Sequence, residues 1–148
     1  MQFKILNTRE IKKLIKQIEE EYKAASLKLD YIFLKNNENK IFIISEDLKN
    51  LDATKLHINN LGLYLAKIET DGVRLSVEGS QLVGNNSQKI LDLDRKEIDE
   101  WIRGEDVKKE TDKKGYFIVR HGEDFYGTAK IKNNALKNFV PKYRRIKK

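Results

Sequence analysis

The sequence predicts an α+β fold, in which an N-terminal α/β part is followed by a helix and a small, partly closed β-barrel. Three observations support this prediction. An apolar stripe at helical spacing lies near the N-terminus, short apolar runs flank turn-forming residues, and a second capped helix precedes a strand meander. The chain of 148 residues is long enough for one ordinary domain or for two small ones that share a core.

The first element is predicted to be an amphipathic helix over residues 8–25. Asn7 and Glu10 have the spacing of a capping box, which marks a helix start. Five apolar residues follow at helical spacing and form one stripe: Ile11, Leu14, Ile15, Ile18 and Tyr22. We expect this stripe to be part of the core.

Two hairpins are predicted in the first half of the chain. The runs Tyr31–Leu34 and Ile41–Ile44 flank a polar segment and indicate the first hairpin. The second comprises Leu61–Thr70 and Val73–Glu78, which flank Asp71-Gly72, a dipeptide favoured in tight two-residue turns.

The remaining first-half segments are less regular. Residues 46–60 have room for a short helix, and residues 79–84 form either a short helix or a loop. Residues 85–88 are polar and lack periodicity, so we place a domain boundary there. The predicted parts are residues 1–86 and residues 87–148.

The second helix begins at Asp94, which forms a capping box with Glu97. Ile98, Trp101 and Ile102 form its buried stripe, and Gly104 occupies the position of a C-terminal cap. A charged loop over residues 105–114 then leads into the strands.

The predicted meander has three strands, Gly115–Arg120, Phe125–Lys132 and Leu136–Val140. The turns between them contain residues 121–124 and Asn133-Asn134, and Pro141 stops the last strand. Three phenylalanines occupy strand positions and are expected in the core: Phe117, Phe125 and Phe139.

The net charge of +7 is unevenly distributed. Residues 113–148 contain eleven Lys and Arg but only two acids, whereas residues 1–112 contain 19 basic and 21 acidic residues. An excess of lysine throughout the chain does not explain why acids nearly vanish after Asp112. A basic segment on a near-neutral body is typical of a protein that binds a polyanion.

Few residues are available for catalysis or for metal binding. Cysteine is absent, and the two histidines, His57 and His121, lack the spacing of a metal site. No phosphate-binding loop motif is present. We therefore expect a protein that is not an enzyme and that needs no metal or cofactor. No apolar run is long enough to span a membrane and the N-terminus does not resemble a secretory signal, so we expect a cytoplasmic location.

Eight candidate binding residues lie in the basic segment: Lys130, Lys132, Lys137, Asn138, Lys142, Tyr143, Arg144 and Arg145. Lys130 and Lys132 alternate on one strand and should share a face. Lys and Arg can neutralise phosphates. Tyr143 either stacks on an unpaired base or closes the barrel, and Asn138 either contacts a ligand or satisfies buried backbone groups.

Several segments of the sequence together resemble a known RNA-binding family. These are LDLDRKE (91–97), WIRGE (101–105), GTAK (127–130) and LKNFVPKYR (136–144). They are similar to the PUA-like domain of RsmF-type small-subunit rRNA cytosine-C5 methyltransferases and to related stand-alone archaeal proteins. LGLYLAK (61–67) and RLSVEG (74–79) resemble the pre-PUA region of these proteins and of ribosome-biogenesis factors of the Nip type.

The resemblance implies a pre-PUA-like α/β domain, a C-terminal PUA-like pseudobarrel, and binding of rRNA or tRNA in rRNA modification or ribosome assembly. It implies Lys130, Lys137, Asn138, Lys142 and Arg144 as RNA contacts. Gly104 would be a structural cap, and Glu105 a partner for a barrel lysine. The methyltransferase domain of that family binds S-adenosylmethionine and carries cysteines, so we expect no such domain in this cysteine-free chain.

The sequence thus leads to RNA binding as the first hypothesis. The second is an adaptor that binds a protein partner, such as a methyltransferase or a ribosome-assembly factor, because the family domain normally works attached to an enzyme. The third is an RNA-processing enzyme with a dispersed active site, which is supported only by surface acids such as Glu105 and Asp106.

Overall fold

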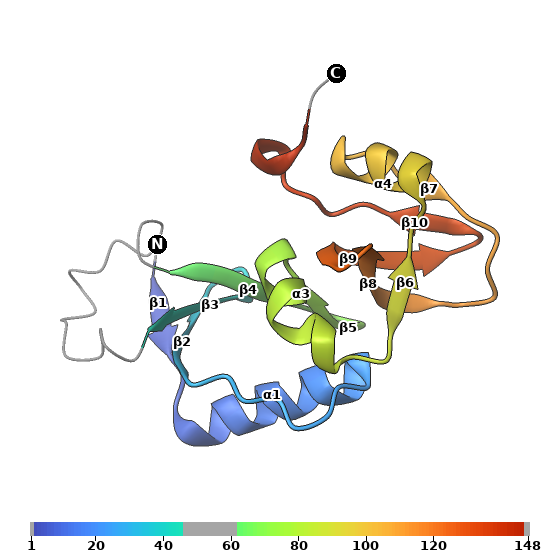
Figure 1. Ribbon diagram of the computed structural model, residues 1–148. Coiled ribbons are helices and arrows are strands. Elements are labelled where there is room, and N and C mark those ends of the chain that lie inside the picture. The colour runs from blue at the N-terminus through green and yellow to red at the C-terminus, as the bar shows by residue number, and fades with distance from the viewer. Residues whose placement is uncertain (1, 46–61, 147–148) are drawn as a thin grey trace.

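The computed structural model describes residues 2–45 and 62–146, and it has the predicted α+β class. These residues form three α-helices and two five-stranded sheets. Figure 1 shows the sheets side by side with one short helix between them. The segment 46–60, which has room for a short helix, lies outside the described residues.

The first sheet is antiparallel throughout, in the order β1 (Phe3–Ile5), β2 (Tyr31–Asn36), β3 (Lys40–Ser45), β4 (Leu63–Glu69) and β5 (Gly72–Leu75). Both predicted hairpins are confirmed, but the last predicted strand ends at Leu75 and not at Glu78, because Ser76 caps the helix α3 (Val77–Val83) that begins there. The turn of the second one lies one residue earlier than predicted, because Glu69 pairs with Gly72 and leaves Thr70 and Asp71 in the turn. Strand β1 was not predicted.

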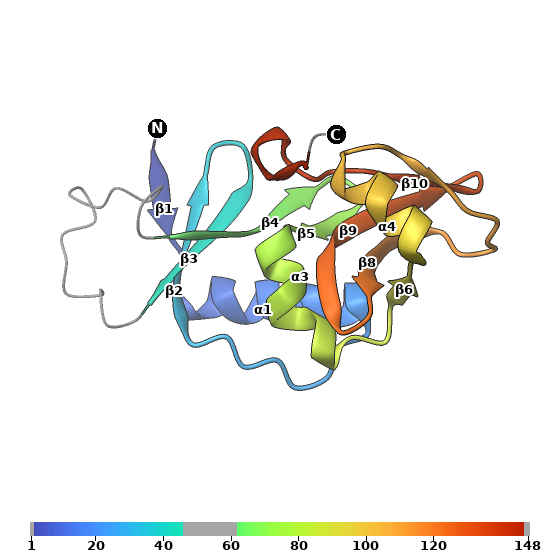
Figure 2. The ribbon, with the colours of Figure 1, turned by 45° about the horizontal axis from the view of Figure 1, so that its top comes forward.

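Helix α1 (Thr8–Tyr22) covers one face of the first sheet (Figure 2). The capping box of Asn7 and Glu10 is present, and the predicted stripe packs into the core. The helix ends three residues earlier than predicted. Lys23 adopts a left-handed conformation with φ of 46°, and this conformation terminates the helix.

The second sheet has the order β6 (Ile90–Asp92), β8 (Gly115–His121), β9 (Asp124–Lys132), β10 (Ala135–Lys137) and β7 (Val107–Lys108). Only the pairing of β6 with β8 is parallel among these described strands. Helix α4 (Arg95–Ile102) packs on one face through Trp101, which is fully buried and donates its indole N–H to Tyr126 O at 2.8 Å.

Several predicted boundaries in the second half need correction. The loop over residues 105–114 contains the short strand β7, which pairs with β10. Strand β10 ends at Lys137 instead of Val140, because the Asn138 side chain takes over the bonding of nearby backbone groups. Phe125 is buried as predicted, whereas Phe117 and Phe139 lie at the edges of the core.

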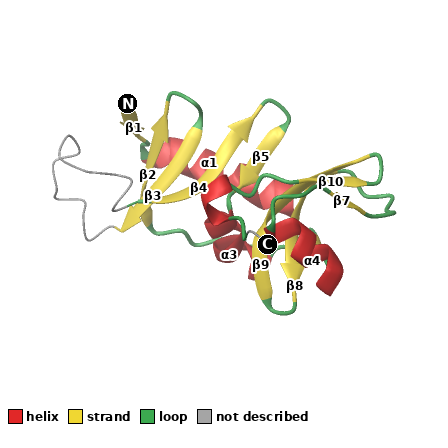
Figure 3. Ribbon diagram, turned by 90° about the horizontal axis from the view of Figure 1, so that it is seen from above, coloured by secondary structure: helices red, strands yellow, loops and turns green. Residues whose placement is uncertain are grey.

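Helix α3 (Val77–Val83) joins the two sheets (Figure 3). It approaches β4 so closely that a Cβ at Gly79 would lie 2.1 Å from Leu65 O. On its other side, Ser80 Oγ accepts a hydrogen bond of 2.9 Å from Gly127 N of β9. The main core contains residues from both predicted parts, among them Ile18 and Ile118. The boundary near residue 86 itself stays a prediction.

In the part of the chain that the structure describes, no helix has the length and hydropathy required to cross a bilayer.

Candidate nucleic-acid interface

Lys130, Lys132 and Lys137 lie together on β9 and β10, as predicted. Lys130 and Lys137 are directly paired across the two strands, and Lys132 follows two residues after Lys130 on the same face. Lys132 and Lys137 are exposed, whereas Lys130 is half-buried. Three cations on one sheet face can neutralise neighbouring phosphates.

Lys130 is already paired with an acid from the first sheet. Its ammonium group forms a salt bridge with Asp71, which also accepts a hydrogen bond of 2.8 Å from the Tyr116 hydroxyl. The hydrogen bond from Lys130, followed by that from Tyr116, lowers the pKa of Asp71. Burial, together with the neighbouring Asp71, raises the pKa of Tyr116.

Asn138 satisfies backbone groups, which was one of its two predicted roles. Its Nδ2 donates to Trp101 O and to Glu105 O, both at 2.8 Å. Its Oδ1 accepts from Val140 N at 2.7 Å. Both amide protons are therefore used inside the protein, and no donor of this side chain is left for RNA.

The segment after Pro141 carries the remaining candidates. Lys142–Arg144 forms a short 3-10 helix, in which Lys142 is exposed and Tyr143 is 78% exposed. This exposure excludes a role for Tyr143 in closing the barrel and leaves its ring available for stacking. Arg144 Nη1 lies 2.7 Å from Glu78 Oε1 of α3, so its charge is paired.

Arg145 holds the C-terminal segment against α4. Its Nε donates to Val140 O at 2.9 Å, and Ile146 N donates to Ile102 O at 2.9 Å. The guanidinium group lies over Gly104, where an added Cβ would be 2.2 Å from Arg145 Nε. Gly104 also has a φ of +88°, which confirms that this glycine is structural. Glu105 pairs with Arg103 at 2.6 Å, and not with a barrel lysine.

The structure thus divides the candidate residues by availability. Within residues 2–45 and 62–146, Lys132, Lys137 and Lys142 form no ion pair, and these three form what we call the open lysine set. Lys130 and Arg144 are paired with Asp71 and Glu78. An anionic ligand can contact the open lysine set without breaking an internal ion pair.

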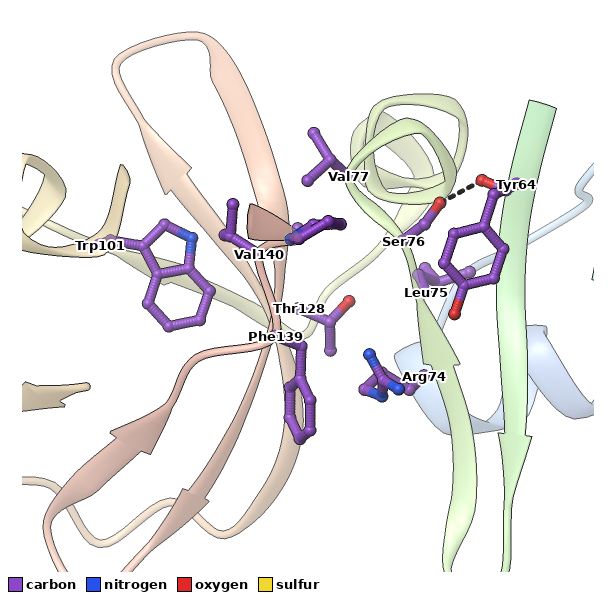
Figure 4. Close-up of a pocket in the computed structure, with 11 residues that line it drawn as sticks. Tyr64, Arg74, Leu75, Ser76, Val77, Trp101, Thr128, Phe139 and Val140 are labelled. Atoms are coloured by element: carbon purple, nitrogen blue, oxygen red, sulfur yellow. Dashed lines mark hydrogen bonds between the residues drawn. The ribbon is translucent and has the colours of Figure 1, made fainter. Parts of the chain in front are cut away.

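A pocket at the junction of the two sheets was not predicted from the sequence. This junction pocket has a cavity volume of about 20 Å³ and is lined by Tyr64, Arg74, Leu75, Ser76, Val77, Trp101, Gly127, Thr128, Phe139, Val140 and Pro141 (Figure 4). The Arg74 guanidinium lies 4.0 Å from the centroid of the Phe139 ring. The sequence gives no local signal for this contact, because it joins β5 to the C-terminal segment.

No cluster of three or more His, Cys, Asp or Glu that could hold a metal ion occurs among the residues that the structure describes.

Comparison with known proteins confirms the resemblance for the second half of the chain. Residues 88–146 match the family model described as the methyltransferase RsmF PUA domain. Two curated relatives are named ribosomal RNA small subunit methyltransferase F, from Vibrio vulnificus strains YJ016 and CMCP6. Each is 27% identical over 106 residues, which cover 71% of this chain and 22% of the relative. The chain therefore spans about a fifth of the length of these relatives.

Proposed function

We propose that this protein binds folded RNA through the open lysine set and Tyr143, and that it acts in rRNA modification or ribosome assembly without a catalytic activity of its own. In this proposal residues 87–148 form a PUA-like pseudobarrel, and the first sheet with α1 forms a pre-PUA-like domain. The observation that carries the proposal is the match of residues 88–146 to an RNA-methyltransferase PUA domain. The charge of the same segment supports it, since acids nearly vanish after Asp112.

The geometry favours contacts to phosphates over the reading of bases. Lys132, Lys137 and Lys142 are exposed point charges, which neutralise phosphates but carry little sequence information. Tyr143 supplies one exposed ring for an unpaired base. Recognition would therefore rest on RNA shape and charge, with at most one stacked base at the C-terminal segment.

The test is a salt titration of the affinity for a folded rRNA fragment and for duplex DNA of equal length. The variant replaces Lys132, Lys137 and Lys142 by Gln, and the matched control replaces Lys12, Lys13 and Lys16 on the exposed side of α1. Each lost phosphate contact reduces the slope of log K against log salt by about 0.7 to 0.9. We expect the first triple variant to lose about two units of slope, and the control to lose far less.

Two results would contradict the proposal. Equal losses in both triple variants would mean that only the net charge matters. Equal affinities of the protein for RNA and duplex DNA, both falling steeply with salt, would indicate a nonspecific polyanion patch.

A protein partner is the second candidate. The curated relatives that match this chain are longer and are named as methyltransferases, and the chain spans 22% of their length. A domain of this kind could therefore act together with a separate methyltransferase or assembly factor. Co-purification from the native cell distinguishes direct RNA binding from an adaptor role, since a protein complex that survives RNase treatment would favour the adaptor.

A further inference from the structure

The junction pocket is built from both halves of the protein. Tyr64 and Arg74 come from the first sheet, Thr128 comes from β9, and Phe139 and Pro141 come from the C-terminal segment (Figure 4). The first two residues lie outside the segment that matches the PUA domain. A function of this pocket would therefore belong to the whole protein and not to either half.

Arg74 lines this pocket and has an unused hydrogen-bond donor. Its side chain is only 14% exposed, and its Nε is buried without a hydrogen-bond partner. Arg74 forms one ion pair within the described residues, in which its Nη2 lies 3.3 Å from Glu69 Oε1. A buried charged donor that lacks an acceptor is costly, and a water molecule or a ligand oxygen in the pocket would supply the acceptor.

The guanidinium group is held in a fixed orientation. It stacks on the Phe139 ring at 4.0 Å, and Lys137 Nζ lies 5.4 Å from the centroid of the same ring. The Arg74 donor is therefore positioned before any ligand arrives, which lowers the entropic cost of binding.

The charges around the pocket favour an anion. Lys40 Nζ lies 5.7 Å from the Tyr64 ring centroid, and Lys137 is exposed on the other side. The two nearby acids are already paired, Glu69 with Arg74 and Lys67, and Glu78 with Arg144. Lys40 is itself paired with Glu38 at 3.6 Å, so the cation near the pocket that forms no ion pair within the described residues is Lys137.

The size of the cavity limits what can enter. A volume of about 20 Å³ accommodates one oxygen atom but not a nucleobase. Tyr64 is neutral at physiological pH, and burial raises the pKa of its phenol further above the ordinary value of 10.0. Tyr143, which is 78% exposed, follows Pro141 of the pocket lining by two residues.

We propose that the junction pocket receives a phosphate oxygen of single-stranded RNA, with Arg74 Nε as its donor and with the adjacent nucleotide beside Tyr64 and Tyr143. This inference rests on the proposed RNA-binding function and extends it to residues before the PUA-like segment. The open lysine set would bind the remainder of the RNA backbone, on the C-terminal side of the same junction.

The experiment measures the affinity for a short oligouridine and for an RNA duplex of the same length. Arg74→Gln removes the charge and the Nε donor, and Arg74→Lys keeps the charge without that donor. Arg95→Gln is the matched control, because its side chain is 83% exposed on α4. We expect both Arg74 variants to weaken oligouridine binding about tenfold, a loss typical of a charge-assisted hydrogen bond, and Arg95→Gln to have little effect.

A second readout is the Nε–H resonance of Arg74 in the unmodified protein, which should shift when oligouridine is added. This resonance tests whether oligouridine reaches Arg74 even if the Arg74 variants fold poorly. Normal oligouridine binding by both variants, with an unshifted resonance, would mean that the pocket holds only water, and would overturn the inference while the RNA-binding function stands. Equal losses for Arg74→Gln and Arg95→Gln would also overturn it. Failure of the unmodified protein to bind any RNA would overturn the proposed function and this inference together.

Discussion

Gly104 and the Arg145 side chain illustrate how a single glycine determines the position of the C-terminal segment. The guanidinium group occupies the space that a Cβ at Gly104 would need. From there Arg145 Nε reaches Val140 O, and the next residue, Ile146, bonds to Ile102 O. The glycine therefore positions the exposed Lys142 and Tyr143, although it has no side chain that could itself bind a ligand.

We predict that Gly104→Ala destabilises the protein more than Gly115→Ala. Both glycines have a positive φ, of +88° and +90°, so both alanines carry backbone strain of about 1–3 kcal/mol. A Cβ at Gly115 meets nothing within 4 Å, whereas one at Gly104 displaces Arg145. Urea unfolding measures both losses. Arg145→Ala should remove the extra cost in the Gly104→Ala background, and equal losses for the two single variants would contradict this account.

Asp71 predicts a specific response to acid. Its pKa is lowered from the ordinary value of 3.8, mainly by the hydrogen bond from Lys130. A lowered folded-state pKa means that the stabilisation is fully present above pH 3.8 and is lost as the pH falls through the lower folded-state value. Asp71→Asn should therefore be less stable than the unmodified protein at neutral pH. The difference in stability between the two proteins should shrink as the pH falls below 3.8.

The urea midpoint measured across the acid range tests this pH dependence. Asp30→Asn is the control, because Asp30 is exposed and forms no ion pair within the described residues. A stability difference for Asp71→Asn that stays constant with pH would show that the Lys130 and Tyr116 contacts contribute nothing in solution.

At the scale of elements, α3 is the joint between the two sheets. Gly79 allows the helix to approach the β4 backbone, and Gly84 allows the Phe125 ring to pack against its end, with a virtual Cβ only 2.6 Å from that ring. Glu78 of the same helix holds Arg144. The short helix thus fixes the relative position of β4, β9 and the C-terminal segment, which line the junction pocket together with β5.

We predict that Gly79→Ala destabilises the protein, against the usual direction for a helix. Alanine in place of glycine ordinarily stabilises a helix by about 1 kcal/mol. Here the new Cβ would lie 2.1 Å from Leu65 O, a backbone atom that cannot turn away, so we expect a loss of about 1–3 kcal/mol. Gln81→Ala, at an exposed position of the same helix, removes only a long contact of 3.5 Å from Nε2 to Phe125 O and should change stability by less than about 0.5 kcal/mol. A stabilising Gly79→Ala would refute the close contact.

The sequence predicts those elements whose signals are local. Capping boxes and apolar periodicity identify α1 and α4, and turn residues identify the hairpins, since Asn133 and Asn134 both adopt positive φ as the tight turn requires. The strands β1, β6 and β7 have only two or three residues, too few for a periodic pattern. Their positions are set by pairing with distant strands, which no local pattern reveals.

The features of the candidate site likewise divide into those with a local sequence signal and those that depend on distant residues. The charge imbalance identifies the exposed lysines, because it can be counted along the chain. The internal role of Asn138 depends on carbonyl groups of Trp101 and Glu105, and the stacking of Arg74 depends on Phe139. These partners are distant in sequence and become neighbours only in the folded protein.

At the scale of the whole molecule, acids of the first part neutralise cations of the second. Asp71, in the turn between β4 and β5, pairs with Lys130, and Glu78 of α3 pairs with Arg144. RNA phosphates would compete with these two carboxylates for the same cations. Ion pairs that are this accessible to solvent contribute little to stability, so a polyanion can displace them at small cost.

We predict that the double variant Asp71→Asn/Glu78→Gln binds RNA more tightly than the unmodified protein. Two carboxylates are removed and two cations become available, so the slope of log affinity against log salt should steepen by about 1 to 2. Glu20→Gln/Asp30→Asn makes the same change in net charge at exposed positions away from these cations. Its slope should stay close to that of the unmodified protein. Equal gains in both double variants would assign the effect to net charge, and no gain in the first would remove Lys130 and Arg144 from the RNA-binding surface.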